Sequence, residues 1–165
     1  MLKNSKKRIG GRKLANFINM PGHLLRRCHQ ISVAIFLDEC QAFDLTPLQF
    51  SVLAALSSYG ALDKATLSRV AALDRTTVSV VLKNLQERGF VASRASDQDR
   101  RATLNDITED GLATLRAAQS DVVRAQERML APLNEDERVE FLRLLAKMAD
   151  ANNMFSRAPQ RTPKA

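Results

Sequence analysis

The stretch DRTTVSVVLKNLQERGFVASRASDQDRRATLNDIT, residues 74–108, sets the fold of this chain. Its first residue, Asp74, is a good N-cap because a carboxylate accepts hydrogen bonds from the free amides of a first helical turn. Apolar residues then recur at helical spacing, at Val78, Val81, Leu82 and Leu85. Gly89 follows where a left-handed residue can end a helix. These residues predict a helix with one buried stripe.

The remainder of the stretch predicts a β-hairpin. Residues 90–92 (FVA) have the composition of a strand, and residues 96–101 (SDQDRR) are too polar to fill a core. Residues 96–101 therefore form the predicted tip, and residues 102–107 form the returning strand.

The segment before residue 74 supplies the other parts of a DNA-binding head. A short helix over 64–73, with Asp63 as its cap, precedes the helix that begins after Asp74, as in a helix-turn-helix pair. Thr46 and Pro47 begin a further helix that extends to Ser58, and residues 60–62 supply a short strand that can pair with the hairpin. This order predicts a winged helix-turn-helix.

The face of the residue 74–88 helix opposite its apolar stripe carries hydroxyl, methyl, amide and basic groups. Its members are Arg75, Thr76, Thr77, Ser79, Val80, Lys83 and Asn84. Such groups suit the major groove, which exposes donors, acceptors and the thymine methyl group. An ordinary polar surface helix is the alternative, and the helix-turn-helix context favours contact with double-stranded DNA.

The run LSRVAALDRTTVSVVLKNLQERGFVASRASDQDRRATLNDITEDG, residues 67–111, resembles the multiple antibiotic resistance regulator (MarR) family of bacterial transcription factors. Three patterns carry the resemblance: L-x-x-x-G-F-V, a D-x-x-D-R-R wing written here as SDQDRR with one residue fewer between the acids, and L-x-x-I-T-x-x-G. The resemblance covers about residues 24–155. It implies a homodimeric winged-helix repressor or activator whose DNA affinity is changed by a small molecule or by oxidation.

The predicted wing carries three arginines, Arg94, Arg100 and Arg101. Either Arg100 or Arg101 can enter a minor groove, where narrow A·T-rich DNA concentrates negative potential. The other would pair with Asp97 or Asp99 and hold the tip rigid. An exposed ion-paired turn with little energetic value is the alternative.

Composition favours a mainly α fold with a small β wing. The 165 residues include only six Gly and five Pro, and no Trp. The net charge is +7, but residues 1–13 carry six basic and no acidic residues, and residues 156–165 add three more basic residues. The charge therefore lies in the tails. The N-terminal arm is either a solvated tail or a contact for phosphates or a minor groove.

The predicted helices over 21–45 and 108–155, outside the winged domain, have wide apolar faces that one neighbour cannot cover. We expect two copies to interleave them in a twofold dimer, with a coiled-coil seam or a monomeric bundle as the structural alternatives. The expected divisions are a flexible basic arm (1–20), a dimerisation helix (21–45), a winged helix-turn-helix domain (46–107), C-terminal dimerisation helices (108–155) and a disordered basic tail (156–165).

The resemblance places an effector pocket between the dimerisation layer and the winged domain. Basic and aromatic residues near it are His23, Arg26, Arg27, His29, Phe36, Phe43 and Phe50. Together they would suit a small aromatic or heteroaromatic carboxylate. Residues 20–40 also resemble the regulators of nicotinate degradation, which suggests a nicotinate derivative. Solvated or ion-paired arginines and a packed His29 are the alternative.

Two cysteines allow a redox alternative. Cys28 and Cys40 lie twelve positions apart on one predicted helix, about 18 Å along its axis, so they cannot bridge within an intact chain. Across a dimer they could. The neighbouring acids Asp38 and Glu39 should raise the pKa of Cys40, which favours an ordinary reduced thiol.

Other function classes find less support in the sequence. Glycine-rich phosphate loops, nucleophile elbows and metal-ligand motifs are absent, and His23 and His29 project from different helix faces. We expect no enzyme activity, metal or cofactor.

Apolar runs are too short to span a bilayer and no signal core follows the N-terminal charges, which predicts a cytoplasmic protein. A nonspecific architectural DNA-binding protein is the competing class; it would show little sequence preference.

Overall fold

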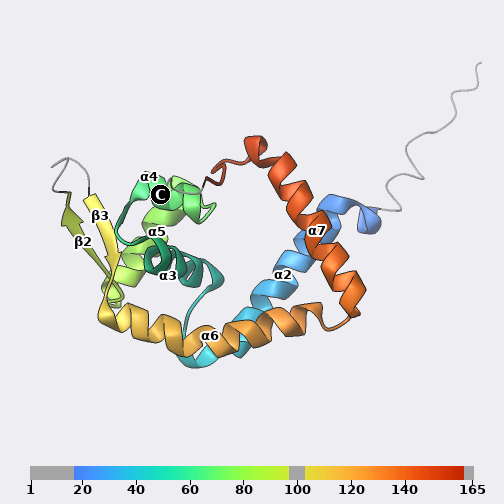
Figure 1. The fold of residues 1–165 in the computed structure, drawn as a ribbon, viewed down its shortest axis with the longest axis horizontal. Coiled ribbons are helices and arrows are strands. Elements are labelled where there is room, and N and C mark those ends of the chain that lie inside the picture. Colours follow the sequence, from blue (N-terminus) through green and yellow to red (C-terminus); the bar gives the residue numbers. More distant parts are fainter. Residues whose placement is uncertain (1–16, 97–102, 162–165) are drawn as a thin grey trace, which may run out of the picture.

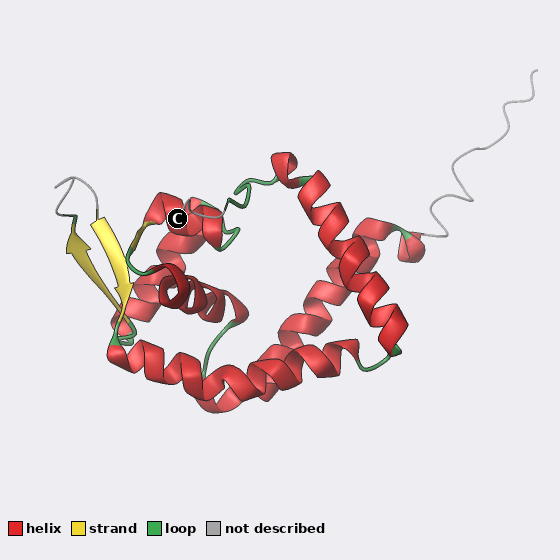
Figure 2. Cartoon of the chain, viewed as in Figure 1, coloured by secondary structure: helices red, strands yellow, loops and turns green. Residues whose placement is uncertain are grey.

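The computed structural model describes residues 17–96 and 103–161 (Figure 1). It is mainly helical with one small sheet, as predicted (Figure 2). The elements in chain order are η1 (Phe17–Asn19), α2 (Pro21–Glu39), η2 (Gln41–Phe43), α3 (Pro47–Tyr59), β1 (Leu62–Asp63), α4 (Lys64–Val70), α5 (Arg75–Glu87), β2 (Val91–Ala95), β3 (Thr103–Ile107), α6 (Glu109–Leu130), α7 (Glu135–Ala151) and η3 (Asn153–Phe155).

The helices α3, α4 and α5 enclose the main hydrophobic core. Each contributes side chains with almost no exposed surface, among them Leu53 of α3, Leu67 of α4 and Leu82 of α5. The start of α3 is held by the predicted capping box, in which Thr46 and Gln49 accept hydrogen bonds from each other's backbone amides. These helices therefore fold around apolar side chains of one chain.

The sheet is antiparallel, with strand order β1-β3-β2. Val91 of β2 pairs with Ile107 of β3, and Leu62 of β1 pairs with Asn105 of β3. The strands next to the helices start one or two residues later than the sequence patterns indicated, because the preceding glycines are used as helix ends. Gly60 is the C-cap of α3 and Gly89, with φ of 75°, ends α5.

The junction between the hairpin and α6 requires a glycine. A Cβ atom on Gly111 would lie 2.2 Å from the carbonyl oxygen of Phe90. Thr108 caps α6 by accepting a hydrogen bond from the Gly111 amide, and its own amide donates to Phe90. The last residue of the L-x-x-I-T-x-x-G pattern is thus explained by close approach of two backbones.

The outer helices extend away from the winged domain (Figure 1). The helix α2 packs against α6, whereas none of the residues of α7 is buried. The sequence predicted a continuous helix to about residue 43, but α2 ends at Glu39 and a short 3-10 turn, η2, follows. The left-handed residue Asp44 (φ 49°) then turns the chain into α3. Among the described helices, none combines the length and apolar character needed to cross a membrane.

The C-terminal segment of residues 156–161, the described part of the expected basic tail, has no helix or strand. After α7 and η3 the chain returns to the winged domain and ends beside α4 (Figure 1). The Arg161 amide donates to the carbonyl of Arg69 at 3.2 Å, and the Gln160 side chain donates to the carbonyl of Val70 at 3.3 Å. Residues 160 and 161 therefore contact the last turn of α4.

Candidate nucleic-acid interface

Both ends of α5 are fixed by its own sequence. Asp74 accepts a hydrogen bond from the Thr77 amide at 3.0 Å and another from the Thr77 hydroxyl at 2.7 Å. These two bonds, the amide contact first, lower the pKa of the Asp74 carboxyl. At the other end, the amides of Gly89 and Phe90 donate to the carbonyls of Gln86 and Leu85, which is a Schellman motif. The helix is thus a rigid rod of thirteen residues.

The buried stripe of α5 sets which side chains face outward. Val78, Leu82 and Leu85 have at most 1% of their surface exposed. The exposed residues on the remaining surface include five of the seven predicted DNA contacts, namely Arg75, Thr76, Val80, Lys83 and Asn84. Val80 is 55% exposed, which is unusual for a branched apolar residue between polar neighbours. A thymine methyl group would be a suitable partner for it.

The other two predicted contacts on α5 are engaged within the helix. Thr77 is half-buried because its hydroxyl belongs to the Asp74 cap. The Ser79 hydroxyl is half-buried and donates to the Arg75 carbonyl at 2.9 Å. Lys83 lies 3.7 Å from Glu87, but both side chains are more than 60% exposed, so this ion pair is weak and easily exchanged.

The α4–α5 turn is tight and internally bonded. The Leu73 amide donates to the Ser68 carbonyl at 3.0 Å, while the Ser68 hydroxyl donates to the Leu73 carbonyl. Ala72 adopts a left-handed conformation with φ of 52°. Asp63 caps α4 by accepting from the amides of Ala65 and Thr66. The turn therefore holds α4 and α5 in one fixed arrangement.

The wing is tied to α5 by a polar network around Asn105. The Asn105 side chain, only 1% exposed, donates to the Leu62 carbonyl and accepts from the Ser93 hydroxyl at 2.8 Å. Gln86 of α5 donates to Ser93 in turn. Arg94 is exposed on β2, whereas Arg100 and Arg101 lie outside the described residues. The base of the wing is thus positioned against α5, the helix predicted to enter the major groove.

Arg88 connects the end of α5 to the turn that follows α2. Its guanidinium group donates to the carbonyls of Phe43 and Asp44 and lies 4.7 Å from the centre of the Phe90 ring. Arg88 was not predicted from the sequence, because the carbonyls that it binds lie more than forty positions away. These contacts join the end of α5 to the turn that follows α2.

Two cavities lie where an effector was expected. One, of about 230 Å³, is bounded by α2, the start of α3 and α6; we call it the α2–α6 cavity. The other, of about 360 Å³, lies between α3 and α6 and is the α3–α6 cavity. His29 and Phe36 line the α2–α6 cavity and Phe50 lines the α3–α6 cavity. The rings of Phe36 and Phe50 touch edge-on, with centres 5.9 Å apart.

The structure does not bring the other predicted effector residues into these cavities. His23 stacks edge-on against Phe17, with ring centres 5.0 Å apart, and Arg26 donates to Gln30 on the same exposed helix face. Arg27 is exposed, and Phe43 packs against the winged-domain core. The α3–α6 cavity instead supplies Arg116, which sequence reasoning missed. Its position one residue after Leu115, which lines the same cavity, is the sequence signal that could have identified it.

The two cysteines have different environments. Cys28 is exposed, while Cys40 is buried. Burial, and then the charges of Asp121 and Glu39, raise the pKa of the Cys40 thiol. Arg124 and Arg128 of α6 form ion pairs with Glu39 nearby. Within residues 17–96 and 103–161, no group of three or more His, Cys, Asp or Glu side chains is arranged to hold a metal ion.

Comparison with known proteins identifies the family. A family model described as the MarR family matches residues 43–102. The HTH-type transcriptional repressor NicR of Pseudomonas putida is 35% identical over 131 residues, 79% of this chain and 83% of NicR. The structure of Bordetella bronchiseptica BpsR, whose DNA binding is regulated by 6-hydroxynicotinic acid, matches with a TM-score of 0.77 and 36% identity over 81% of this chain and 96% of BpsR. The repressor CouR bound to a 23-mer DNA duplex matches with a TM-score of 0.76 and 28% identity over 82% of this chain and 96% of CouR. The chain belongs to the MarR family of DNA-binding transcription regulators.

Proposed function

We propose that this protein is a homodimeric repressor that binds a pseudo-palindromic operator and that a small aromatic or heteroaromatic carboxylate changes its DNA affinity. The observation that carries the proposal is the outward face of α5, where Arg75, Val80 and Lys83 are exposed above a fully buried stripe. One α5 would enter each of two major grooves about one helical turn apart, and each wing would reach a flanking minor groove.

The dimer is supported by the apolar surface of the outer helices. Large apolar side chains on α2 and α7 are 40–66% exposed, including Leu24, Ile31, Val139, Leu142 and Met148. Contiguous apolar surface of this kind is expected to be covered in a stable soluble protein. A twofold axis would place the same surfaces of both copies against each other.

The effector proposal rests on the two cavities and on the properties of the similar proteins. His29 can donate a hydrogen bond to a carboxylate, and the Phe36 and Phe50 rings can pack against an aromatic ring. Because NicR and BpsR are similar to this chain and BpsR responds to 6-hydroxynicotinic acid, a nicotinate derivative is the first effector to test. Effector binding beside α2 and α3 would alter the position of α5 through the Arg88 contacts with residues 43 and 44.

The experiment that tests this proposal is a fluorescence-anisotropy titration at matched salt. One duplex comes from the DNA upstream of the protein's own gene, and a scrambled duplex of the same composition is the control. Selective binding that falls on addition of an aromatic acid supports the proposal. Equal binding to both duplexes would contradict it and favour an architectural protein, and release by peroxide that a reductant reverses would assign the response to a cysteine instead.

Variants then assign the two sites separately. Arg75→Ala and Lys83→Ala should each weaken operator binding by about 1–3 kcal/mol if they contact base edges, with dimerisation unchanged. Lys147→Ala, on α7, is a control that removes one positive charge away from α5. His29→Ala should reduce the effector response while DNA affinity is retained, whereas Arg27→Ala removes an exposed cation outside both cavities and should leave the response unchanged. A response reduced by Arg116→Ala but not by His29→Ala would move the effector to the α3–α6 cavity.

A further inference from the structure

We propose that the C-terminal segment of residues 156–161 is part of the DNA-binding surface, where Arg157 and Arg161 contact the phosphate backbone beside the α4–α5 turn. The proposal rests on the proposed function, because it presupposes that α5 enters the major groove. It assigns a binding role to a segment that lies outside the winged domain in sequence and is joined to it only in the folded chain (Figure 1).

Hydrogen bonds close the segment into a loop and join its end to α4. At its start, Asn153 of η3 donates to the Gln160 carbonyl at 3.1 Å and accepts from the Gln160 amide at 2.8 Å, which folds the segment into a loop. At its end, the Gln160 side chain and the Arg161 amide donate to the carbonyls of Val70 and Arg69. These two carbonyls belong to the last turn of α4 and accept donors that the helix itself does not provide.

Packing agrees with the hydrogen bonds. Ala158 is only 7% exposed although the residues on either side of it are more accessible. Ala72, the left-handed residue of the α4–α5 turn, lies with Gln160 and Arg161 around one cavity of about 660 Å³. The segment is therefore seated on the turn that joins the two helices of the helix-turn-helix.

The seated segment brings positive charge to the turn. Arg69 lies in the last turn of α4 and Arg75 is the first residue of α5, and both are exposed. Arg157 and Arg161 are exposed as well, and the charge of Arg157 adds to the hydrogen bonds that lower the pKa of Asp74. Residues 156–161 contain no acidic residue. Two of these arginines, Arg69 and Arg161, thus lie at the end of α4, and the other two, Arg75 and Arg157, lie at the start of α5.

This arrangement fits a phosphate backbone better than a protein or a small ligand. The start of a reading helix in a helix-turn-helix lies against the edge of the major groove, where phosphates flank the bases. Exposed arginines on both sides of it can each neutralise a phosphate, and helix amides at the same place favour negative charge. The four arginines are exposed and residues 156–161 contain no acidic residue, so the cluster suits an anion.

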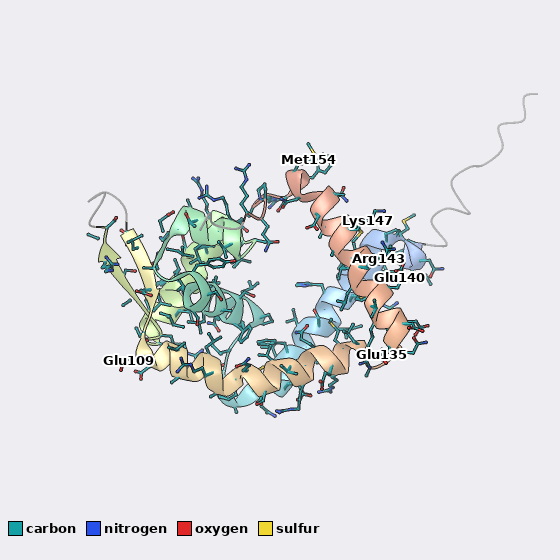
Figure 3. All side chains as sticks on the ribbon, viewed as in Figure 1. Glu109, Glu135, Glu140, Arg143, Lys147 and Met154 are labelled. Atoms are coloured by element: carbon teal, nitrogen blue, oxygen red, sulfur yellow. The ribbon has the colours of Figure 1, made fainter. Side chains whose placement is uncertain are left out.

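The test measures the salt dependence of operator binding for the full-length dimer. For wild-type protein, the operator is first compared with a scrambled duplex, which judges the proposed function on its own. The variant Arg157→Ala/Arg161→Ala should then lower the magnitude of the slope of log K against log salt by about 0.9 for each phosphate that an arginine no longer neutralises. Lys147→Ala on α7 is the control with one cation removed, and its slope should equal that of wild type (Figure 3).

A second variant tests whether the seat of the segment matters. Asn153→Ala retains every arginine but removes both side-chain bonds to Gln160, so it should weaken operator binding and reduce the slope in the same direction. Sedimentation and thermal unfolding verify that the variants remain folded dimers. If wild type binds its operator selectively but the double arginine variant keeps the wild-type slope, or binds more tightly, the proposal is overturned while the proposed function stands. An unchanged slope in Asn153→Ala overturns the seated arrangement.

Discussion

Leucine side chains are buried in the winged domain but exposed on α7. Leu53 and Leu85 of the winged domain have no exposed surface, whereas Leu142 and Leu144 of α7 are 50% and 49% exposed. Both α5 and α7 are amphipathic and well capped, so local sequence does not separate them. The contrast indicates that the winged domain completes its core within one chain, while α7 presents an apolar face that a second copy would cover.

The largest expected effect falls on the region that depends on a partner. Leu142→Glu should weaken dimerisation by about 4 kcal/mol, roughly a thousandfold, because twofold symmetry places the buried charge in the interface twice. Sedimentation equilibrium measures the change. Lys147→Glu, on the same helix, is the control for added negative charge (Figure 3). In Leu142→Glu, operator affinity should fall together with dimerisation. An unchanged dimer would show that α7 is not in the interface.

A cavity in the winged core should act on folding and not on assembly. Leu82→Ala should lower the free energy of unfolding by about 3 kcal/mol, since it removes a side chain with 1% exposure from a packed core. Chemical denaturation at several protein concentrations provides the measurement. The loss of unfolding free energy should be the same at each protein concentration. The loss for Leu142→Ala should instead vary with concentration, because assembly contributes to the stability of the wild-type protein. A concentration-dependent loss for Leu82→Ala would contradict a self-contained winged core.

The junction between the two regions can be tested at Gly111. Gly111→Ala places a methyl group 2.2 Å from the Phe90 carbonyl oxygen, so backbone must move. We expect a loss of about 2 kcal/mol in the free energy of unfolding. Gly22→Ala on α2, where the added carbon meets nothing within 4 Å, is the matched control and should have little effect. Equal stability of the two variants would contradict the close approach of α6 to the hairpin.

The smallest effect concerns the cap of α4. Burial alone would raise the pKa of Asp63, but hydrogen bonds from the Thr66 hydroxyl and from the amides of Thr66 and Ala65 outweigh it and lower the pKa. A carboxyl with a lowered pKa stabilises the fold above its unfolded value of about 4, and this contribution is lost as the pH falls through the folded value.

Asp63→Ala should therefore lower the free energy of unfolding by about 1 kcal/mol at neutral pH, and the deficit should shrink as the pH falls below about 4 and through the lower folded pKa. Asp63→Asn retains an accepting oxygen and should lose less. Thermal unfolding between about pH 3 and neutral pH measures both. A deficit for Asp63→Ala that persists unchanged in acid would show that the carboxylate charge does not contribute to the cap.

The winged domain and the outward face of α5 were predictable from the amino-acid sequence alone. The caps at Thr46, Asp63 and Asp74 were readable because an N-cap and its partner lie within three residues. Helical spacing likewise separated Val78, Leu82 and Leu85 from Arg75 and Lys83, because position on a helix depends only on residue number. These features depend on near neighbours in the chain.

The features that join distant segments emerged only from the folded chain. Arg88 meets residues 43 and 44, and Gln160 and Arg161 meet the end of α4, across separations that no periodic pattern encodes. The same holds for the residues predicted to bind an effector, of which His29 and Phe36 line one cavity and Phe50 lines another together with Arg116. Gln160 and Arg161 donate to backbone carbonyls at the end of α4 that the helix itself leaves without donors, and this match depends on how the helices are placed.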